Sequence, residues 1–201
     1  MCALYLFLSF LEDDRMKKAQ IYDRLERSPV IAATDGGWRA AVVSDAEVLF
    51  HTGASLLTVE EELHLAKQAN KAVFVHIDLA AGIGRDADGL QWLAARGADG
   101  IISTRTQLIR TAHECGLLTV QRFFVLDSKG MHAIDDAIGT GGADLIEIMP
   151  GVIPKALAHV CAQPTPVIAG GLIETKNEIM AALAAGALAV STGKSDLWSG
   201  I

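Results

Sequence analysis

The chain has 201 residues, of which 51% are hydrophobic and 20% charged, and 17 Lys and Arg against 24 Asp and Glu give a formal net charge of -7. This composition excludes a disordered or collagen-like protein, and the acidic balance argues against non-specific binding of nucleic acid through bulk positive charge. Only 5% of the residues are aromatic, so the apolar content is mainly Ala, Val, Ile and Leu. That is typical of buried parallel strands with covering helices, and we expect one α/β domain.

The first segment, MCALYLFLSFLEDDR, is apolar only over its first eleven residues. It is too short to cross a bilayer and lacks the positively charged start and cleavage site of a signal peptide. We expect residues 1–15 to be an extension outside the core and residues 16–201 to form a single barrel domain. A short membrane-touching peptide is the alternative for the extension.

Cysteine and histidine positions indicate neither a disulfide framework nor a metal site. Cys2, Cys115 and Cys161 are an odd number without paired spacing, and the histidines lack metal-ligand spacing. We therefore expect a cytoplasmic protein with no metal, no cofactor and no membrane partner.

From residue 16 onward, short Val- and Ile-rich runs alternate with helical patterns such as residues 58–70 and 174–185. Eight candidate strands cover residues 29–34, 47–53, 72–79, 100–104, 118–125, 145–150, 166–171 and 187–192. Such alternation gives either an open doubly wound sheet or a closed barrel. An open flavodoxin-like sheet usually has about five strands, so eight favour a small TIM-type (β/α) barrel.

The predicted barrel lacks a full helix after its eighth strand. Only nine residues, GKSDLWSGI, follow the eighth strand, which leaves no room for a full eighth helix. A helix over residues 17–27 is expected to cover that part of the barrel wall.

Polar side chains are predicted to point into the barrel from several strands. Because side chains alternate along a strand, AVFVHIDL places His76 and Asp78 inside, and LIEIMP places Glu147 inside. A buried carboxylate needs a partner, and the candidates are His76 and Arg122. In QRFF the alternation is ambiguous, so either Gln121 or Arg122 faces inward. A polar layer that only fixes the barrel geometry is the alternative.

Glycines and hydroxyl side chains follow the last two strands. PVIAGG ends in Gly170 and Gly171, and ALAVSTGK carries Ser191 and Thr192. In TIM barrels phosphate often binds between the loops after strands seven and eight, where glycine lets backbone N–H groups approach the anion. These four residues predict a phosphate site; tight turns that need glycine for backbone reasons are the alternative.

Charge is uneven along the chain: residues 76–129 carry six Lys and Arg against six Asp and Glu, so this stretch is neutral and the remainder holds the whole acidic excess. Arg85, Arg105, Arg110 and Arg122 could gather near one rim of the barrel, with isolated solvated arginines as the alternative. The first three are candidate RNA contacts.

Several long runs together resemble the glycerol-uptake operon antiterminator regulatory family, over about residues 17–198. The runs are VFVHIDLAAGIGRD, ADGIISTRTQLIRTAHECGLLTVQRFF, LIEIMPGVIPK, PVIAGGLIETKNEI and GALAVSTGKSDLW. The resemblance implies a barrel-type fold, glycerol 3-phosphate as ligand, and binding to the leader of an operon's mRNA.

Carried onto this sequence, the resemblance touches polar residues inside the matching runs. These are His76, Asp78, Arg85, Ser103, Gln121, Arg122, Glu147, Ser191 and Thr192, with the glycines Gly82, Gly170 and Gly171. It implies that Asp78, Glu147 and neighbouring polar groups contact the glycerol hydroxyls. The run STGKSDLW departs from the family, which has a more polar run there, so the resemblance does not extend to Lys194 as a ligand.

The sequence thus predicts a regulator that binds operon leader mRNA when glycerol 3-phosphate, or a related small phosphate ester, occupies the C-terminal mouth of the barrel. The alternative is a TIM-barrel lyase or isomerase acting on a small phosphorylated sugar, with His76, Asp78 and Glu147 as acid and base groups.

Overall fold

Eight parallel strands close into a barrel in the computed structural model, which describes residues 16–125, 131, 134–136, 138 and 142–200. The strands are β1 (Val30–Thr34), β2 (Val48–His51), β3 (Ala72–His76), β4 (Gly100–Ser103), β5 (Leu118–Phe124), β6 (Leu145–Met149), β7 (Val167–Gly170) and β8 (Ala189–Thr192). Each pairs with the next, and β1 pairs with β8 to close the ring, with Val30 opposite Val190. The predicted TIM-type barrel and its eight strands are confirmed.

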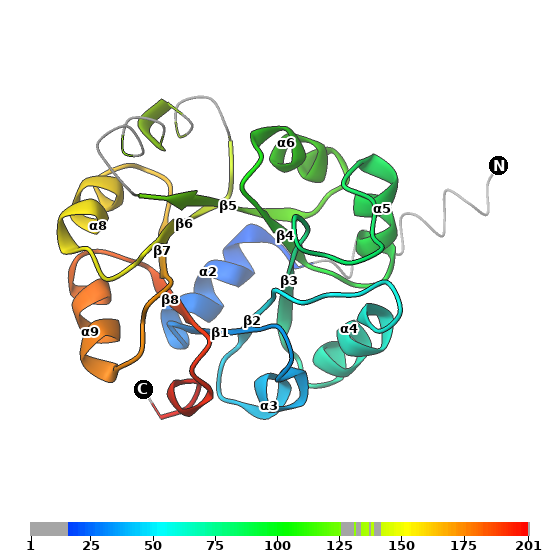
Figure 1. The fold of residues 1–201 in the computed structure, drawn as a ribbon, viewed down its shortest axis with the longest axis horizontal. Coiled ribbons are helices and arrows are strands. Elements are labelled where there is room, and N and C mark those ends of the chain that lie inside the picture. The colour runs from blue at the N-terminus through cyan, green and yellow to red at the C-terminus, as the bar shows by residue number, and fades with distance from the viewer. Residues whose placement is uncertain (1–15, 126–130, 132–133, 137, 139–141, 201) are drawn as a thin grey trace.

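Most of the helices surround the ring of strands, as Figure 1 shows. The surrounding helices are α3 (Trp38–Val43), α4 (Val59–Gln68), α5 (Ala87–Ala95), α6 (Thr106–Glu114), α8 (Pro154–Cys161), α9 (Lys176–Ala184) and the 3-10 helix η1 (Ser195–Leu197), whereas α2 (Lys18–Arg27) lies across the ring. Local sequence signals fix where several of them begin. Asp86 caps α5 by accepting a 2.9 Å hydrogen bond from the Gly89 N–H, and Thr175 with Glu178 forms a capping box on α9.

The strands separate two apolar cores. Val73, Val75 and Ile77 belong to the core between strands and outer helices, whereas Phe74 belongs to the core inside the barrel. Period-two alternation therefore holds along β3, as expected from its sequence.

Helix α2 closes the bottom of the barrel, which differs from its expected place in the wall. Ile21 and Leu25 are buried and pack with the inward-facing core that contains Phe50 and Phe74. In Figure 1, α2 lies across the centre of the ring of strands. The position beside β8 is taken by η1 and Trp198, whose indole N–H donates to the Thr192 carbonyl at 2.8 Å. The described residues after β8, 193–200, contain only this short 3-10 helix and no full eighth helix, as predicted.

No helix in the described part of the chain is both long and apolar enough to cross a membrane. The expectation for residues 1–15 lies outside the described residues.

Candidate functional site

A buried ion pair lies at the C-terminal end of the barrel. Arg122 on β5 pairs with Glu147 on β6, and its Nε donates to Glu147 Oε2 at 2.6 Å. The other oxygen, Oε1, accepts a 2.6 Å hydrogen bond from the Ser191 hydroxyl on β8. This resolves the ambiguity in β5, because Arg122 faces inward. Gln121 faces the other way and donates to the Thr106 hydroxyl at 2.9 Å. It therefore does not join Arg122 and Glu147 inside the barrel.

Gly170 leaves the space that this network occupies. A Cβ at Gly170 would overlap the Glu147 carboxylate and lie 2.6 Å from the Ser191 hydroxyl oxygen. A side chain is therefore sterically excluded where the three strands meet. The glycine that the sequence assigned to a phosphate site here makes room for a carboxylate.

A cavity of about 300 Å³ lies above this network and is lined by the loops after β7 and β8. Gly171, Leu172 and Gly193 line it, and no hydrogen bond between described residues uses their backbone N–H groups. Gly171 has a φ of 74°, a conformation that glycine adopts without strain. Unpartnered N–H groups beside a guanidinium form a corner that can hold an anion.

The two hydroxyl groups predicted to donate to phosphate are engaged elsewhere. Thr192 donates to the Ile173 carbonyl at 2.7 Å, and Ser191 donates to Glu147. Both residues line the cavity, but their hydroxyl groups already donate within the protein. The donors that remain available to an anion there are the backbone N–H groups and Arg122. Lys194 does not line the cavity, and its Nζ lies 3.3 Å from a Glu174 carboxylate oxygen.

The Asp78 carboxylate is hydrogen-bonded to the end of β4 and to the loop between β4 and α6. Strand β3 ends at His76, and a turn closed by a 3.1 Å hydrogen bond from the Leu79 N–H to the His76 carbonyl places Asp78 beyond it. Its carboxylate accepts hydrogen bonds from the hydroxyl of Ser103 and from the N–H and hydroxyl of Thr104 at 2.7–3.1 Å. Burial alone would raise the pKa of Asp78, but these hydrogen bonds outweigh it and hold that pKa below its ordinary value.

His76 is buried inside the barrel, with 4% of its surface exposed. Its Nδ1 has no hydrogen-bond partner among the described residues. Burial, and after it the positive charge of Arg122, lowers the pKa of His76 below its ordinary value, against the opposing charges of Asp78 and Glu147. The imidazole is therefore kept neutral at neutral pH.

The three candidate RNA-contact arginines are exposed on neighbouring parts of the barrel. Arg85 follows β3, and Arg105 follows β4 with its Nε 3.7 Å from Asp78 Oδ1. Arg110 lies further along α6. Arg85 and Arg105 are thus at the same end of the barrel as the cavity.

Sequence reasoning missed half of the cavity wall. Thr34, Asp35 and Thr52 line it from the ends of β1 and β2, and Met149 lines it from β6. The available signal was their position directly after, or at the end of, a parallel strand, where sites in such barrels are built.

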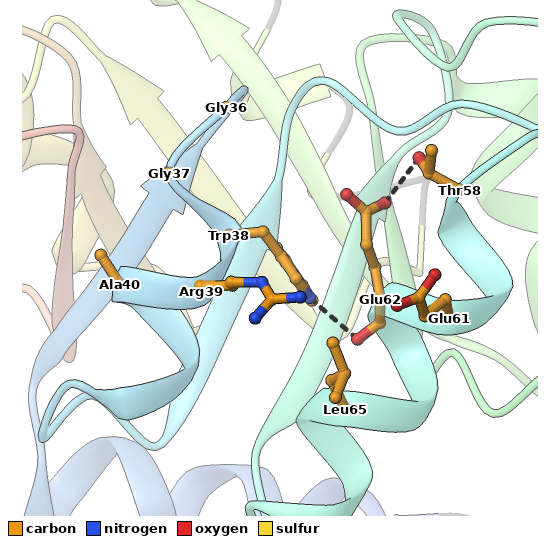
Figure 2. A pocket seen from close by; sticks show the side chains of 9 residues that line it. All are labelled: Gly36, Gly37, Trp38, Arg39, Ala40, Thr58, Glu61, Glu62 and Leu65. Carbon is orange, nitrogen blue, oxygen red and sulfur yellow. Dashed lines mark hydrogen bonds between the residues drawn. The ribbon is translucent and has the colours of Figure 1, made fainter.

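Two further cavities lie outside the barrel mouth. One, of about 400 Å³, lies between α3 and α4, where Figure 2 shows Trp38 and Thr58 bonded to Glu62. Glu62 also accepts from His51 at 2.8 Å, so its polar groups join the two helices. The other, of about 710 Å³, lies at the opposite end, beside α2, α4 and α5. Neither contains a residue from the predicted site.

Comparisons with known proteins point to one family. Residues 30–198 match the model of the glycerol-3-phosphate responsive antiterminator family. The chain is 32% identical over 179 residues to an uncharacterized protein of Escherichia coli (strain K12), YgcP, covering 87% of this chain and 94% of that one.

Solved structures agree with this family match. The chain is similar to a glycerol uptake operon antiterminator regulatory protein of Listeria monocytogenes, with a TM-score of 0.79, 31% identity and coverage of 86% and 95% of the two chains. A glycerol uptake operon antiterminator-related protein of Thermotoga maritima has a TM-score of 0.76 and 31% identity, covering 85% of this chain and 98% of the other. An aldolase, QR15, gives a TM-score of 0.67 at 12% identity over 85% of this chain and 92% of its own, which shows a shared fold alone.

Proposed function

Because the chain belongs to the family of glycerol-3-phosphate-responsive antiterminators, we propose that it binds glycerol 3-phosphate in the barrel mouth and operon leader mRNA in response, acting in the cytoplasm. The observation that carries this proposal is the cavity whose wall joins three unpartnered N–H groups to a buried, carboxylate-held arginine. A small phosphate ester would supply an anion that these groups can bind.

The ligand's phosphate would lie on the loops after β7 and β8, against the N–H groups of Gly171, Leu172 and Gly193. Arg122 is held by its Nε, so its terminal nitrogens are oriented by Glu147 before any ligand arrives. Such preorganisation lowers the entropic penalty of binding. Ser191 and Thr192 line the cavity as well, while Gly170 makes room for the Glu147 carboxylate beside it.

RNA would lie on the same rim, near Arg85 and Arg105, with Arg110 at its edge. Ligand binding changes RNA affinity only if the rim has two arrangements that bind RNA differently. The chain is acidic overall, so we expect few phosphate contacts and a shallow dependence of affinity on salt. A salt slope that implies on the order of ten or more neutralised phosphates would contradict a limited patch.

A gel-shift titration of the operon's own leader RNA, with and without glycerol 3-phosphate, tests the proposal. Gly193→Asp is the sharpest variant, because a Cβ there has room, 3.7 Å from its nearest neighbour, the Ala33 carbonyl oxygen, and a carboxylate would repel the phosphate. Gly193→Ala is the matched neutral control. We expect ligand-dependent RNA binding in the wild type and in Gly193→Ala, but not in Gly193→Asp. Ligand-independent or absent RNA binding would contradict antitermination.

The competing function is an enzyme, favoured by the fold that the chain shares with an aldolase. His76, Asp78 and Glu147 would be its acid and base groups, but Glu147 and Asp78 are both held by hydrogen bonds within the protein. Turnover of a triose or pentose phosphate at an ordinary enzymatic rate would establish the enzyme and overturn the regulator.

A further inference from the structure

Of the carboxylates of Glu147, Asp78 and Asp35, the last belongs to a residue that lines the cavity and receives no hydrogen bond from the described residues. Glu147 is shared between Arg122 and Ser191, and Asp78 is held by the loop after β4. Asp35 lines the cavity, and no described residue donates a hydrogen bond to its carboxylate. The sequence resemblance pointed to the first two carboxylates for the ligand's hydroxyls, whereas the available acceptor is the third.

The backbone on either side of Asp35 is fixed by its neighbours. The Thr34 hydroxyl accepts hydrogen bonds from the N–H groups of Gly36 and Gly37 at 3.3 and 2.7 Å, which closes the turn after β1. Gly53, after β2, packs directly on this turn, because a Cβ there would lie 2.8 Å from the Asp35 Cα. The backbone that carries the carboxylate is therefore held in place at the rim.

Asp35 lies across one small cavity from Arg122, the cationic member of the anion-binding corner, while the loop after β8 that carries Gly193 lies beside the turn after β1. Asp35 follows β1, and Thr52 follows the adjacent β2, whereas Arg122 and Glu147 come from β5 and β6 across the barrel. An ionised carboxylate only accepts hydrogen bonds. A molecule that spans the cavity from the phosphate corner must therefore bring donors to the Asp35 wall, and a second anionic group there would be repelled.

We propose that Asp35 recognises the hydroxyl groups of the bound phosphate ester and thereby selects a polyol phosphate over a phosphorylated carboxylic acid. This inference rests on the proposed function, since it assumes that a phosphate ester occupies the mouth. An ammonium group is the other class of donor that a carboxylate accepts, so an amine-bearing phosphate ester is the competing ligand in the test. The selectivity follows from the Asp35 carboxylate, which takes no part in the buried network of Arg122, Glu147 and Ser191.

Calorimetric titration with two three-carbon ligands tests this proposal. Glycerol 3-phosphate and 3-phosphoglycerate share a skeleton, but the second ends in a carboxylate. We expect the wild type to prefer glycerol 3-phosphate by at least about tenfold, since a hydrogen bond to a charged group contributes about 1.5–3 kcal/mol and 1.4 kcal/mol is tenfold. In Asp35→Asn, affinity for glycerol 3-phosphate should fall about tenfold and affinity for 3-phosphoglycerate should rise.

Changes in opposite directions for the two ligands separate recognition from loss of structure, which would weaken both. Asp23→Asn, at an exposed position of α2 at the opposite end, makes the same charge change and should leave both affinities unchanged. If the wild type binds glycerol 3-phosphate but Asp35→Asn alters both ligands alike or neither, this inference fails and the proposed function stands. Tighter binding of phosphoethanolamine than of glycerol 3-phosphate would also overturn it. If the wild type binds no phosphate ester, both fail.

Discussion

Arg122 and Glu147 form a salt bridge in which Nε lies 2.6 Å from Oε2, with the carboxylate fully buried. Removing one member of a buried pair leaves an uncompensated charge, which destabilises a fold by about 3–5 kcal/mol. We expect Arg122→Met alone to lower the free energy of unfolding by that amount, measured by urea denaturation. The double variant Arg122→Met, Glu147→Leu should recover most of the stability while losing ligand binding. Additive losses in the double variant would argue against coupling between these residues.

A methyl group at Gly170 should disrupt the same network. The Cβ of Gly170→Ala has no room between Glu147 and Ser191, and overpacking of this kind destabilises by about 1–3 kcal/mol. Gly36→Ala is the matched control, because a Cβ there meets nothing within 4 Å. Thermal unfolding of both variants measures the difference. Equal melting temperatures would show that the network tolerates displacement.

His76 should make stability depend on pH. Its pKa in the folded protein is lowered by burial and then by Arg122, so protonation favours the unfolded chain. The stabilising contribution of neutral His76 is present above the unfolded pKa of about 6.5 and is lost as pH falls through the folded value. Denaturant midpoints between pH 7.5 and 5 should fall more steeply for the wild type than for His76→Gln. Identical slopes would show that His76 is not the source of the pH dependence of stability.

Helix α2 should stabilise the barrel from below. Leu25 is completely buried against the inward-facing core, so we expect Leu25→Ala to lower the free energy of unfolding by about 2–5 kcal/mol. Glu26→Ala, at the adjacent exposed position, should change it by no more than about 0.5 kcal/mol. Urea denaturation compares the two. A small effect of Leu25→Ala would mean that the barrel does not depend on this helix.

The strands and their inward faces could be predicted because buried parallel strands have a distinctive composition and an alternation of two. The inward positions of His76 and Glu147 follow from that alternation alone. The position of Asp78 does not, since β3 ends at His76 and the following turn redirects the chain. The orientations of Gln121 and Arg122 are decided by Glu147 on a neighbouring strand, which is a tertiary contact.

The site itself was less predictable than the fold. The two glycine loops mark the right end of the barrel, but the direction of the Ser191 and Thr192 hydroxyl bonds depends on acceptors far away in sequence. Asp35 and Thr52 carry no motif and are recognised only when the closed barrel places β1 beside β8 and β2 beside β1. The location of α2 was not predictable either, because its apolar residues Ile21 and Leu25 pack on the core inside the barrel, which forms only when the strands close.

The most direct test of ligand binding in the mouth is an amide titration by ¹⁵N–¹H NMR with glycerol 3-phosphate. We expect the largest shifts at the N–H groups of Gly171, Leu172 and Gly193, which have no partner among the described residues, and no such shifts in Gly193→Asp. Absent shifts, or shifts confined to the cavity beside α2, α4 and α5, would contradict a phosphate ester at the C-terminal mouth.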